Sequence, residues 1–222
     1  MGTLLYYFLY ALFYIPSRIF LPARVINKKN RPKKGAILAC NHLSAIDPIA
    51  IGMYTTRKMH FFTKKELSKN WFFRIMIPAV GSFFVERGKA DIGAVKKSLK
   101  ILNDGKVLMI FPEGHRNMDS DVIQELKAGA VTFAIKTDTR VIPVIIWRRP
   151  KACRRNFIYY GEPISFSQYK DVKMTQEDKR AATMILTQKM AAAQEELRAY
   201  LLSKRPRLLK RYERNLKLKT EN

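Results

Sequence analysis

The feature that most constrains the fold is a strand–loop–helix unit between residues 35 and 53. Ala36–Cys40 is a short apolar run, which predicts a buried strand. The loop Asn41–Ile46 follows, and then Asp47-Pro48 favours a helix start with Asp47 as N-cap and Pro48 as the first helical residue. This order is typical of α/β proteins, whose ligands bind beyond the carboxyl ends of the strands.

Strands and helices alternate through the first 160 residues. Apolar runs predict further strands at residues 59–63, 106–111, 140–146 and 157–160. Apolar residues at helical spacing predict one helix over residues 92–103 and another over about 127–136. We therefore expect an α/β domain with a largely parallel or mixed sheet flanked by helices.

After residue 160 the pattern changes to longer helices. Thr175 and Asp178 have the spacing of a capping box. Apolar residues then recur on one helical face, at Leu186, Met190, Ala193, Leu197 and Leu201. The basic tail beyond Pro206 also has apolar residues at helical intervals, so it predicts either a membrane-surface helix or a frayed, solvated one.

The charge of the chain predicts an anionic partner. Lys and Arg number 42 against 18 Asp and Glu, which gives a net charge of +24. Such an excess goes beyond what solubility needs and points to nucleic acid, an anionic membrane surface or other anionic molecules.

The N-terminus favours the membrane. Residues 2–17 carry no charge and are mostly apolar or aromatic, and a basic stretch follows up to Lys34. As a helix they would span about 24 Å, short of a hydrocarbon core of about 30 Å, and Pro16 interrupts the run. We predict a monotopic anchor on the cytoplasmic face of the cell membrane, in preference to a signal peptide or a buried core helix.

The expected organisation is thus an anchor with its basic flank (1–34), an α/β catalytic core (35–170), and a C-terminal helix with a basic tail (171–222). Cys40 and Cys153 do not make a disulfide framework, and no Cys or His cluster has metal-ligand spacing, so no metal is expected. Cys40 is expected to fill the core in preference to carrying an acyl group.

His42 and Asp47 are the candidate catalytic pair. A histidine steered by a carboxylate can deprotonate a hydroxyl so that it attacks an acyl carbonyl. Residues five apart on one helix point in different directions, but here the loop after the strand can fold back onto the helix start. Taken alone, the pair leaves two interpretations open, a catalytic base with its acid or a helix cap beside a loop histidine.

Three further blocks accompany this pair. Gly81–Arg87 has the pattern G-x2-F-x2-R, Phe111–Arg116 directly follows an expected strand, and Val141–Val144 lies within a late strand. In order and spacing, the four blocks resemble those of the glycerolipid acyltransferases, most closely the bacterial lysophosphatidate acyltransferases. The resemblance covers about residues 35–163.

The resemblance implies a reaction. His42 would take the proton from the sn-2 hydroxyl of a lysophosphatidate, and Asp47 would orient the imidazole. The acyl donor would be the thioester of acyl-CoA or of an acidic acyl carrier protein, with no cofactor. The resemblance also implies a set of acceptor-binding residues, which either bind the phosphate or shape the turn that carries the phosphate ligands. They are Arg87, Glu113, Gly114, Arg116 and Lys127.

Some alternatives remain open at this stage. The family usually has threonine where this chain has His115, which places a second histidine near the site; we prefer His42 because it has a paired carboxylate. His60 is expected to be structural. Glycerol-3-phosphate or another lysophospholipid could replace lysophosphatidate as acceptor. A basic nucleic-acid-binding module is disfavoured, and no nucleic-acid partner is expected, because the aromatic residues are not interleaved with arginines.

Overall fold

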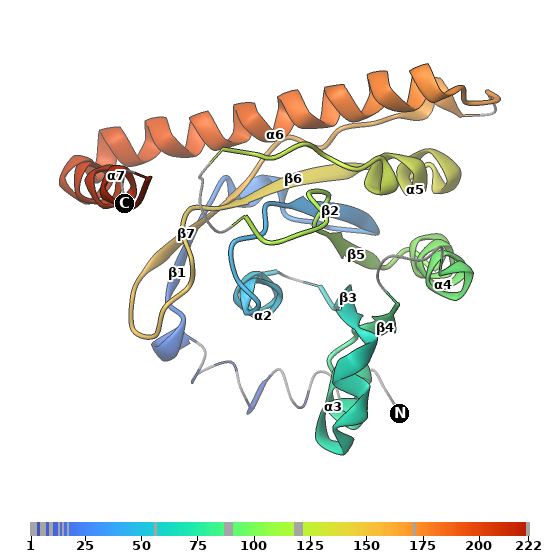
Figure 1. Cartoon of the computed structure of the whole chain (residues 1–222), viewed down its shortest axis with the longest axis horizontal. Coiled ribbons are helices and arrows are strands. Elements are labelled where there is room, and N and C mark those ends of the chain that lie inside the picture. The colour runs from blue at the N-terminus through green and yellow to red at the C-terminus, as the bar shows by residue number, and fades with distance from the viewer. Residues whose placement is uncertain are drawn as a thin grey trace.

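The computed structural model describes residues 4, 8, 11, 12, 14, 16, 18–55, 57–86, 91–117, 122–170 and 172–220, with side chains through residue 216. Its centre is a seven-stranded sheet in the order β1-β7-β6-β2-β5-β3-β4 (Figure 1). The strands are β1 (Ala23–Ile26), β2 (Ala36–Cys40), β3 (Met59–Lys64), β4 (Phe83–Val85), β5 (Val107–Ile110), β6 (Val141–Ile146) and β7 (Asn156–Tyr160). Neighbours run parallel except β6 and β7, so the sheet is mixed, as predicted.

The middle of the sheet is buried because its strands are apolar on both faces. Every residue of β2, β5 and β6 is buried, as expected for parallel strands covered on both sides. Alternate side chains point to opposite faces, so Ile37 and Ala39 join one core cluster, and Leu38 and Cys40 join the other. Cys40 is a core residue, as predicted.

Helices cover both faces of the sheet (Figure 1). One core cluster packs under α4 (Ile92–Asn103), α5 (Gly129–Thr137) and α6 (Gln176–Lys204). The other packs against α2 (Asp47–Gly52), and α3 (Trp71–Ala79) projects from that same side. Short 3-10 turns complete the chain at η1 (Lys28–Asn30), η2 (Lys65–Lys69) and η3 (Ser167–Tyr169).

The C-terminal helices belong to the packed structure. The predicted capping box is present at the start of α6, and the five apolar residues predicted on one face are all buried. The tail forms α7 (Pro206–Thr220), in which Leu209 is buried and the Tyr212 ring lies 4.8 Å from that of Trp147. Of the two alternatives left open for the tail, the frayed, solvated helix does not fit, because Leu209 and Tyr212 share one helical face that packs onto the core. The membrane-surface helix stays a prediction.

The N-terminal region contains a strand that the sequence did not predict. Before residue 21 the chain is helical at all its described positions. β1 then pairs with β7, although it lies within the segment expected as the anchor's basic flank. It was missed because Arg24 interrupts a run of only four residues. Within the described residues, no helix combines the length and apolarity needed to cross a bilayer.

Candidate active site

Parallel pairing brings two of the sequence blocks to one edge of the sheet. β2 and β5 are neighbours, with Ala39 opposite Ile110, so both strands end at the same level. The loops that leave them carry His42 and Glu113. These loops therefore lie side by side beyond the carboxyl edge, where ligands bind in α/β sheets.

His42 and Asp47 are in direct contact. Nδ1 of His42 lies 3.0 Å from Oδ2 of Asp47, the His42 side chain is 9% exposed, and the Asp47 side chain is fully buried. Because an ionised carboxylate can only accept a hydrogen bond, Nδ1 is the nitrogen that carries the proton in neutral His42. Nε2 has no hydrogen-bond partner among the described residues, so it is the nitrogen that can take a proton.

Asp47 also shapes the loop that carries His42. Its Oδ2 accepts hydrogen bonds from the backbone N–H groups of Leu43 (2.7 Å) and Ser44 (2.6 Å). Helix α2 begins at Asp47 itself, and Ile46 occupies the N-cap position. The expectation of an Asp47 N-cap was therefore wrong. The carboxylate turns back to the preceding loop because three donors converge on it there, which excludes the interpretation of Asp47 as a simple cap.

The loop after β5 holds His42 from its other side. The Phe111 ring stacks on the imidazole, with centroids 3.9 Å apart and an angle of 20° between the planes. The backbone N–H of His42 donates to Oε1 of Glu113 at 3.1 Å, and its carbonyl accepts from the N–H of Asn117 at 2.7 Å. Ring and backbone of His42 are therefore fixed by the third sequence block. The sequence did not predict that Phe111 and Asn117 would contact His42, although Phe111 begins the third sequence block.

Glu113 is buried, with 1% of its surface exposed. Burial raises the pKa of its carboxyl, against the opposing effect of the hydrogen bond from the His42 backbone. The structure thus places Glu113 under His42, where it positions the backbone of the loop. A direct contact between Glu113 and an acceptor remains a prediction.

The rest of the third block faces solvent. His115 and Arg116 are exposed, and so is Lys127. Gly114 adopts a left-handed backbone with φ of 74°, and a Cβ there would lie 2.8 Å from Cε of Lys127. Gly114 is therefore favoured by its left-handed turn, whereas the exposed end of Lys127 could move aside for a side chain. The predicted phosphate ligand Arg87 lies outside the described residues.

Asn41 joins the site to the neighbouring strand β6. Its side-chain amide donates to the carbonyl of Ile146 at 3.1 Å, and its Oδ1 accepts from the N–H of the same residue at 2.8 Å. This pair of bonds continues the β2–β6 ladder by one residue and fixes the start of the catalytic loop. Pro143 is buried within β6, in keeping with the structural role expected of it.

His60 is placed as a structural residue. It lies in β3, and its Nδ1 is 2.8 Å from the carbonyl of Gly81, to which it donates. Burial lowers the pKa of this imidazole. His60 therefore ties β3 to the turn before β4, as the sequence led us to expect.

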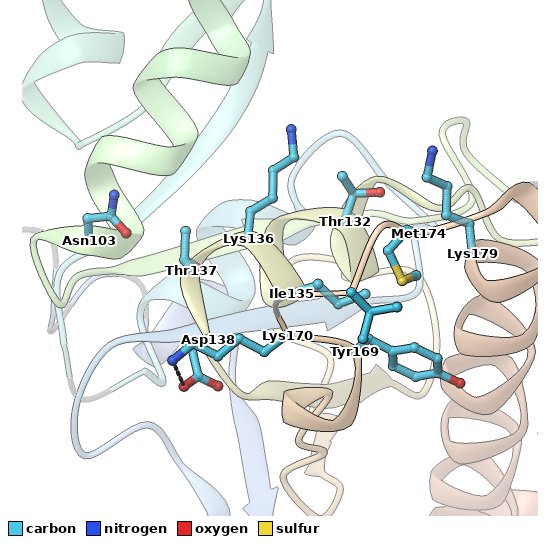
Figure 2. A pocket seen from close by; sticks show the side chains of 11 residues that line it. Asn103, Thr132, Ile135, Lys136, Thr137, Asp138, Tyr169, Lys170, Met174 and Lys179 are labelled. Carbon is cyan, nitrogen blue, oxygen red and sulfur yellow. Dashed lines mark hydrogen bonds and ion pairs between the residues drawn. The ribbon is translucent and has the colours of Figure 1, made fainter.

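A large pocket lies at the opposite edge of the sheet (Figure 2). It has a volume of about 550 Å³ and lies between the end of α5 and the start of α6. Lys170 pairs with Asp138 at 3.0 Å, whereas Lys136 and Lys179 point away from Asp138. Its lining includes none of the predicted site residues, because α5 ends where β6 begins, at the amino end of the strands.

The fold and the site together place a histidine–aspartate pair beyond the carboxyl edge of an α/β sheet. The chain belongs to the acyltransferase family, whose model matches residues 22–147. This confirms the resemblance to acyltransferases and shows that the chain is an acyltransferase. The match begins next to β1, the strand that the sequence did not predict.

Individual relatives agree with this assignment. The chain is 28% identical over 182 residues to the 1-acyl-sn-glycerol-3-phosphate acyltransferase of Bacillus subtilis (strain 168), with 78% of this chain and 89% of the relative covered. It is 32% identical over 139 residues to the enzyme of the same name from Borreliella burgdorferi, with 61% and 55% covered. The crystal structure of the 1-acyl-sn-glycerophosphate acyltransferase of Thermotoga maritima matches with a TM-score of 0.61 at 23% identity, over 89% of this chain and 80% of that one, which shows the fold.

Proposed function

We propose that this acyltransferase moves a fatty acyl group from a thioester to the sn-2 hydroxyl of 1-acyl-sn-glycerol-3-phosphate, which makes phosphatidate for phospholipid synthesis. The observation that carries the proposal is the contact of 3.0 Å between Nδ1 of His42 and Oδ2 of Asp47. The names of the Bacillus subtilis and Borreliella burgdorferi relatives support the choice of acceptor.

The first step is activation of the hydroxyl. Nε2 of His42 takes the hydroxyl proton while the oxygen attacks the thioester carbonyl, so a C–O bond forms as the proton leaves. Asp47 keeps the ring in the tautomer that leaves Nε2 unprotonated, and it stabilises the imidazolium that results. Phe111, stacked on the ring at 3.9 Å, limits its rotation.

The second step is loss of the thiol. The tetrahedral intermediate collapses, the C–S bond breaks, and the leaving sulfur takes its proton back from the His42 imidazolium. Every proton removed in the first step is thus returned in the second, and no metal or redox cofactor is needed. The donor is acyl-CoA or acyl carrier protein, since both present the same thioester.

Recognition of the acceptor is assigned to basic side chains near the loop after β5. Arg116 is exposed beside the catalytic loop, and its planar guanidinium matches phosphate oxygens in a bidentate pair. Arg87 and Lys127 are proposed as further phosphate contacts. The acceptor is a lipid, so we also propose that the enzyme works at the cytoplasmic face of the cell membrane, held there by residues 1–34.

A transfer assay on the purified protein tests this function. Radiolabelled acyl-CoA and acyl carrier protein would each be combined with lysophosphatidate, lysophosphatidylcholine and glycerol-3-phosphate. The proposal expects labelled phosphatidate from lysophosphatidate with at least one donor, and much slower transfer to the other acceptors. Faster transfer to glycerol-3-phosphate would assign a different acceptor, and no transfer to any acceptor would refute the proposal.

A further inference from the structure

The first turn and a half of α3 projects from the protein with its apolar side chains exposed. Trp71 is 67% exposed, Phe72 50% and Ile75 60%, and Phe73 and Arg74 are exposed as well. Successive residues of a helix point about 100° apart, so five exposed neighbours mean that this end is uncovered all round. We call Trp71, Phe72, Phe73 and Ile75 the aromatic tip.

The fold gives no reason for this exposure. Only Ala79 of α3 is buried, and the helix packs chiefly against the adjacent turn η2. The three aromatic rings contact one another edge to face, Trp71 with Phe72 and Phe72 with Phe73. Soluble proteins rarely leave such a contiguous apolar patch exposed without a partner. The aromatic tip is therefore a surface that something else covers.

Cations surround the aromatic tip. Lys64, Lys69 and Arg74 flank it and are exposed, and Glu66 is the one exposed carboxylate between residues 64 and 75. A further exposed lysine, Lys65, pairs with the carboxylate of Glu86 at 3.2 Å. Aromatic rings with adjacent lysine and arginine are the composition that binds the interface of an anionic bilayer. The charge beside the tip thus favours a negatively charged lipid surface over an apolar protein groove.

A second cationic feature lies beyond α2. A pocket of about 540 Å³ there is lined by five basic residues and no carboxylate. We call it the basic pocket; its basic residues are Arg18, Arg24, Lys28, Arg31 and Arg155. Residues of α2 and the segment next to it line the core cluster on the face of the sheet from which α3 projects (Figure 1). The basic pocket reaches around the β1 edge of the sheet, since Met53 and Tyr54 line it from the side of α2 whereas Arg24 lies over the ring of Tyr200 in α6.

The aromatic tip is also attached to the catalytic edge. β3 ends at Lys64 and leads directly through η2 into α3. β3 pairs in parallel with β5, which pairs with β2, so all three strands end at the edge that carries His42. A surface that binds the tip is consequently held next to the loops of the active site.

We propose that the aromatic tip inserts into the headgroup region of an anionic phospholipid bilayer, with the basic pocket binding phosphate groups of the same leaflet. The aromatic tip lies outside the anchor proposed for residues 1–34, whereas four of the five basic residues of the basic pocket belong to that segment. The proposal rests on the proposed function in one respect, the choice of a lipid surface. Docking through α3 would hold the active site against the leaflet that contains the acceptor.

The two tryptophans make a direct test possible. Trp71 lies in the aromatic tip, whereas Trp147 is buried in the core, so the difference between wild type and Trp71→Phe isolates the Trp71 emission. We expect this emission to move to shorter wavelength when vesicles containing phosphatidylglycerol are added, and to be quenched by lipids brominated near the headgroup. Trp147 in the Trp71→Phe variant should respond to neither. No substrate is present, so the result does not depend on the acyltransferase reaction.

Other outcomes would overturn the proposal. Trp71 emission that is already shifted without vesicles would mean that the tip is covered by another part of this chain or, where the shift grows with protein concentration, by a second copy. Emission that stays unshifted and unquenched on anionic vesicles would show that the tip does not enter a bilayer. Equal binding to vesicles of pure phosphatidylcholine would show that the basic residues beside the tip and in the basic pocket do not select an anionic surface.

A variant pair measures the contribution of the tip. Phe72→Ser with Phe73→Ser should lower the partition constant for anionic vesicles by about tenfold or more, because two partly exposed rings lose their burial in lipid. Met184→Ser with Leu202→Ser is the matched control, since both residues are exposed on α6, and it should leave the partition constant unchanged. Equal effects of the two pairs would contradict the proposal.

Discussion

The two edges of the sheet differ in how their polar groups are arranged. At the carboxyl edge, Asp47 and Glu113 are buried, and both are used to fix the loop that carries His42. At the amino edge, the pocket of about 550 Å³ is lined by lysines and by the exposed ion pair Lys170–Asp138. Buried polar groups are costly unless they are paired. The comparison teaches that the predicted site is distinguished by buried, hydrogen-bonded carboxylates, which the pocket at the amino edge lacks among its described lining residues.

The largest expected effect is at His42. His42→Ala removes the histidine that is paired with Asp47, and loss of a general base typically costs about 10²–10⁴-fold in rate. We expect kcat to fall by this amount in the transfer assay. His115→Thr is the control and should leave transfer largely intact. Loss of activity in the control alone would move the base to His115.

Asp47→Asn should have an effect of similar size. The neutral amide loses the negative charge that accepts the three hydrogen bonds. If its N–H₂ group faces His42, it donates to Nδ1 and so favours the tautomer with the proton on Nε2. We expect the loss in kcat, with KM for the acceptor nearly unchanged. A loss confined to KM would assign Asp47 to substrate binding.

Glu113 tests whether the loop after β5 positions His42. Glu113→Ala leaves a buried N–H of His42 without its acceptor, which costs about 1–3 kcal/mol. Glu113→Gln keeps an oxygen at that place and should restore most of the stability and of kcat. If Gln were as damaging as Ala, the charge of Glu113 would matter more than its hydrogen bond.

The same residue predicts a dependence on pH. Burial raises the pKa of Glu113 above its ordinary value of 4.5, so the folded protein holds this proton more tightly than the unfolded chain does. The stability of wild type relative to Glu113→Gln should therefore be highest at pH below 4.5 and fall as pH rises through the folded pKa. Unfolding by urea at a series of pH values measures this difference. A relative stability that rises with pH would contradict the raised pKa.

Arg116 should have a smaller and more selective effect. Arg116→Ala is expected to raise KM about tenfold or more for lysophosphatidate, since a charge-assisted bond contributes about 1.5–3 kcal/mol. Transfer to monoacylglycerol, which lacks the phosphate, should change little. Equal losses with both acceptors would mean that Arg116 supports the loop instead of binding phosphate.

The smallest effect is expected at the amino edge. Lys136→Ala and Lys179→Ala replace one exposed and one half-buried side chain of the pocket at this edge, neither with an ion pair among the described residues, so stability should change by less than about 0.5 kcal/mol. Transfer rates with acyl-CoA and with acyl carrier protein should both be preserved. A selective loss with acyl carrier protein would show that this edge takes part in donor binding.

The sequence predicted the parts of this molecule that depend on local pattern. The apolar run of β2, the capping box of α6 and the buried face of that helix follow from neighbouring residues alone. The spacing of His42 and Asp47 also sufficed to propose their contact, because the loop between them is short.

What the sequence could not predict depends on the pairing of distant strands. The contacts of Phe111, Glu113 and Asn117 with His42 exist because β5 lies beside β2. β1 is a strand because β7 offers it an edge, and its own four residues carry too weak a pattern. The sequence did not indicate that the aromatic tip would be exposed either, since apolar residues of a helix usually face a core.

The central claim is that Asp47 holds the proton of neutral His42 on Nδ1 and leaves Nε2 free to act as the base. Nitrogen-15 NMR of the histidine rings tests it directly, since the chain has only three histidines and the His60→Gln and His115→Thr variants assign them. The account predicts a protonated Nδ1 and an unprotonated Nε2 at a pH where His42 is neutral, and loss of this preference in Asp47→Asn. A proton found on Nε2 in the wild-type protein would contradict it.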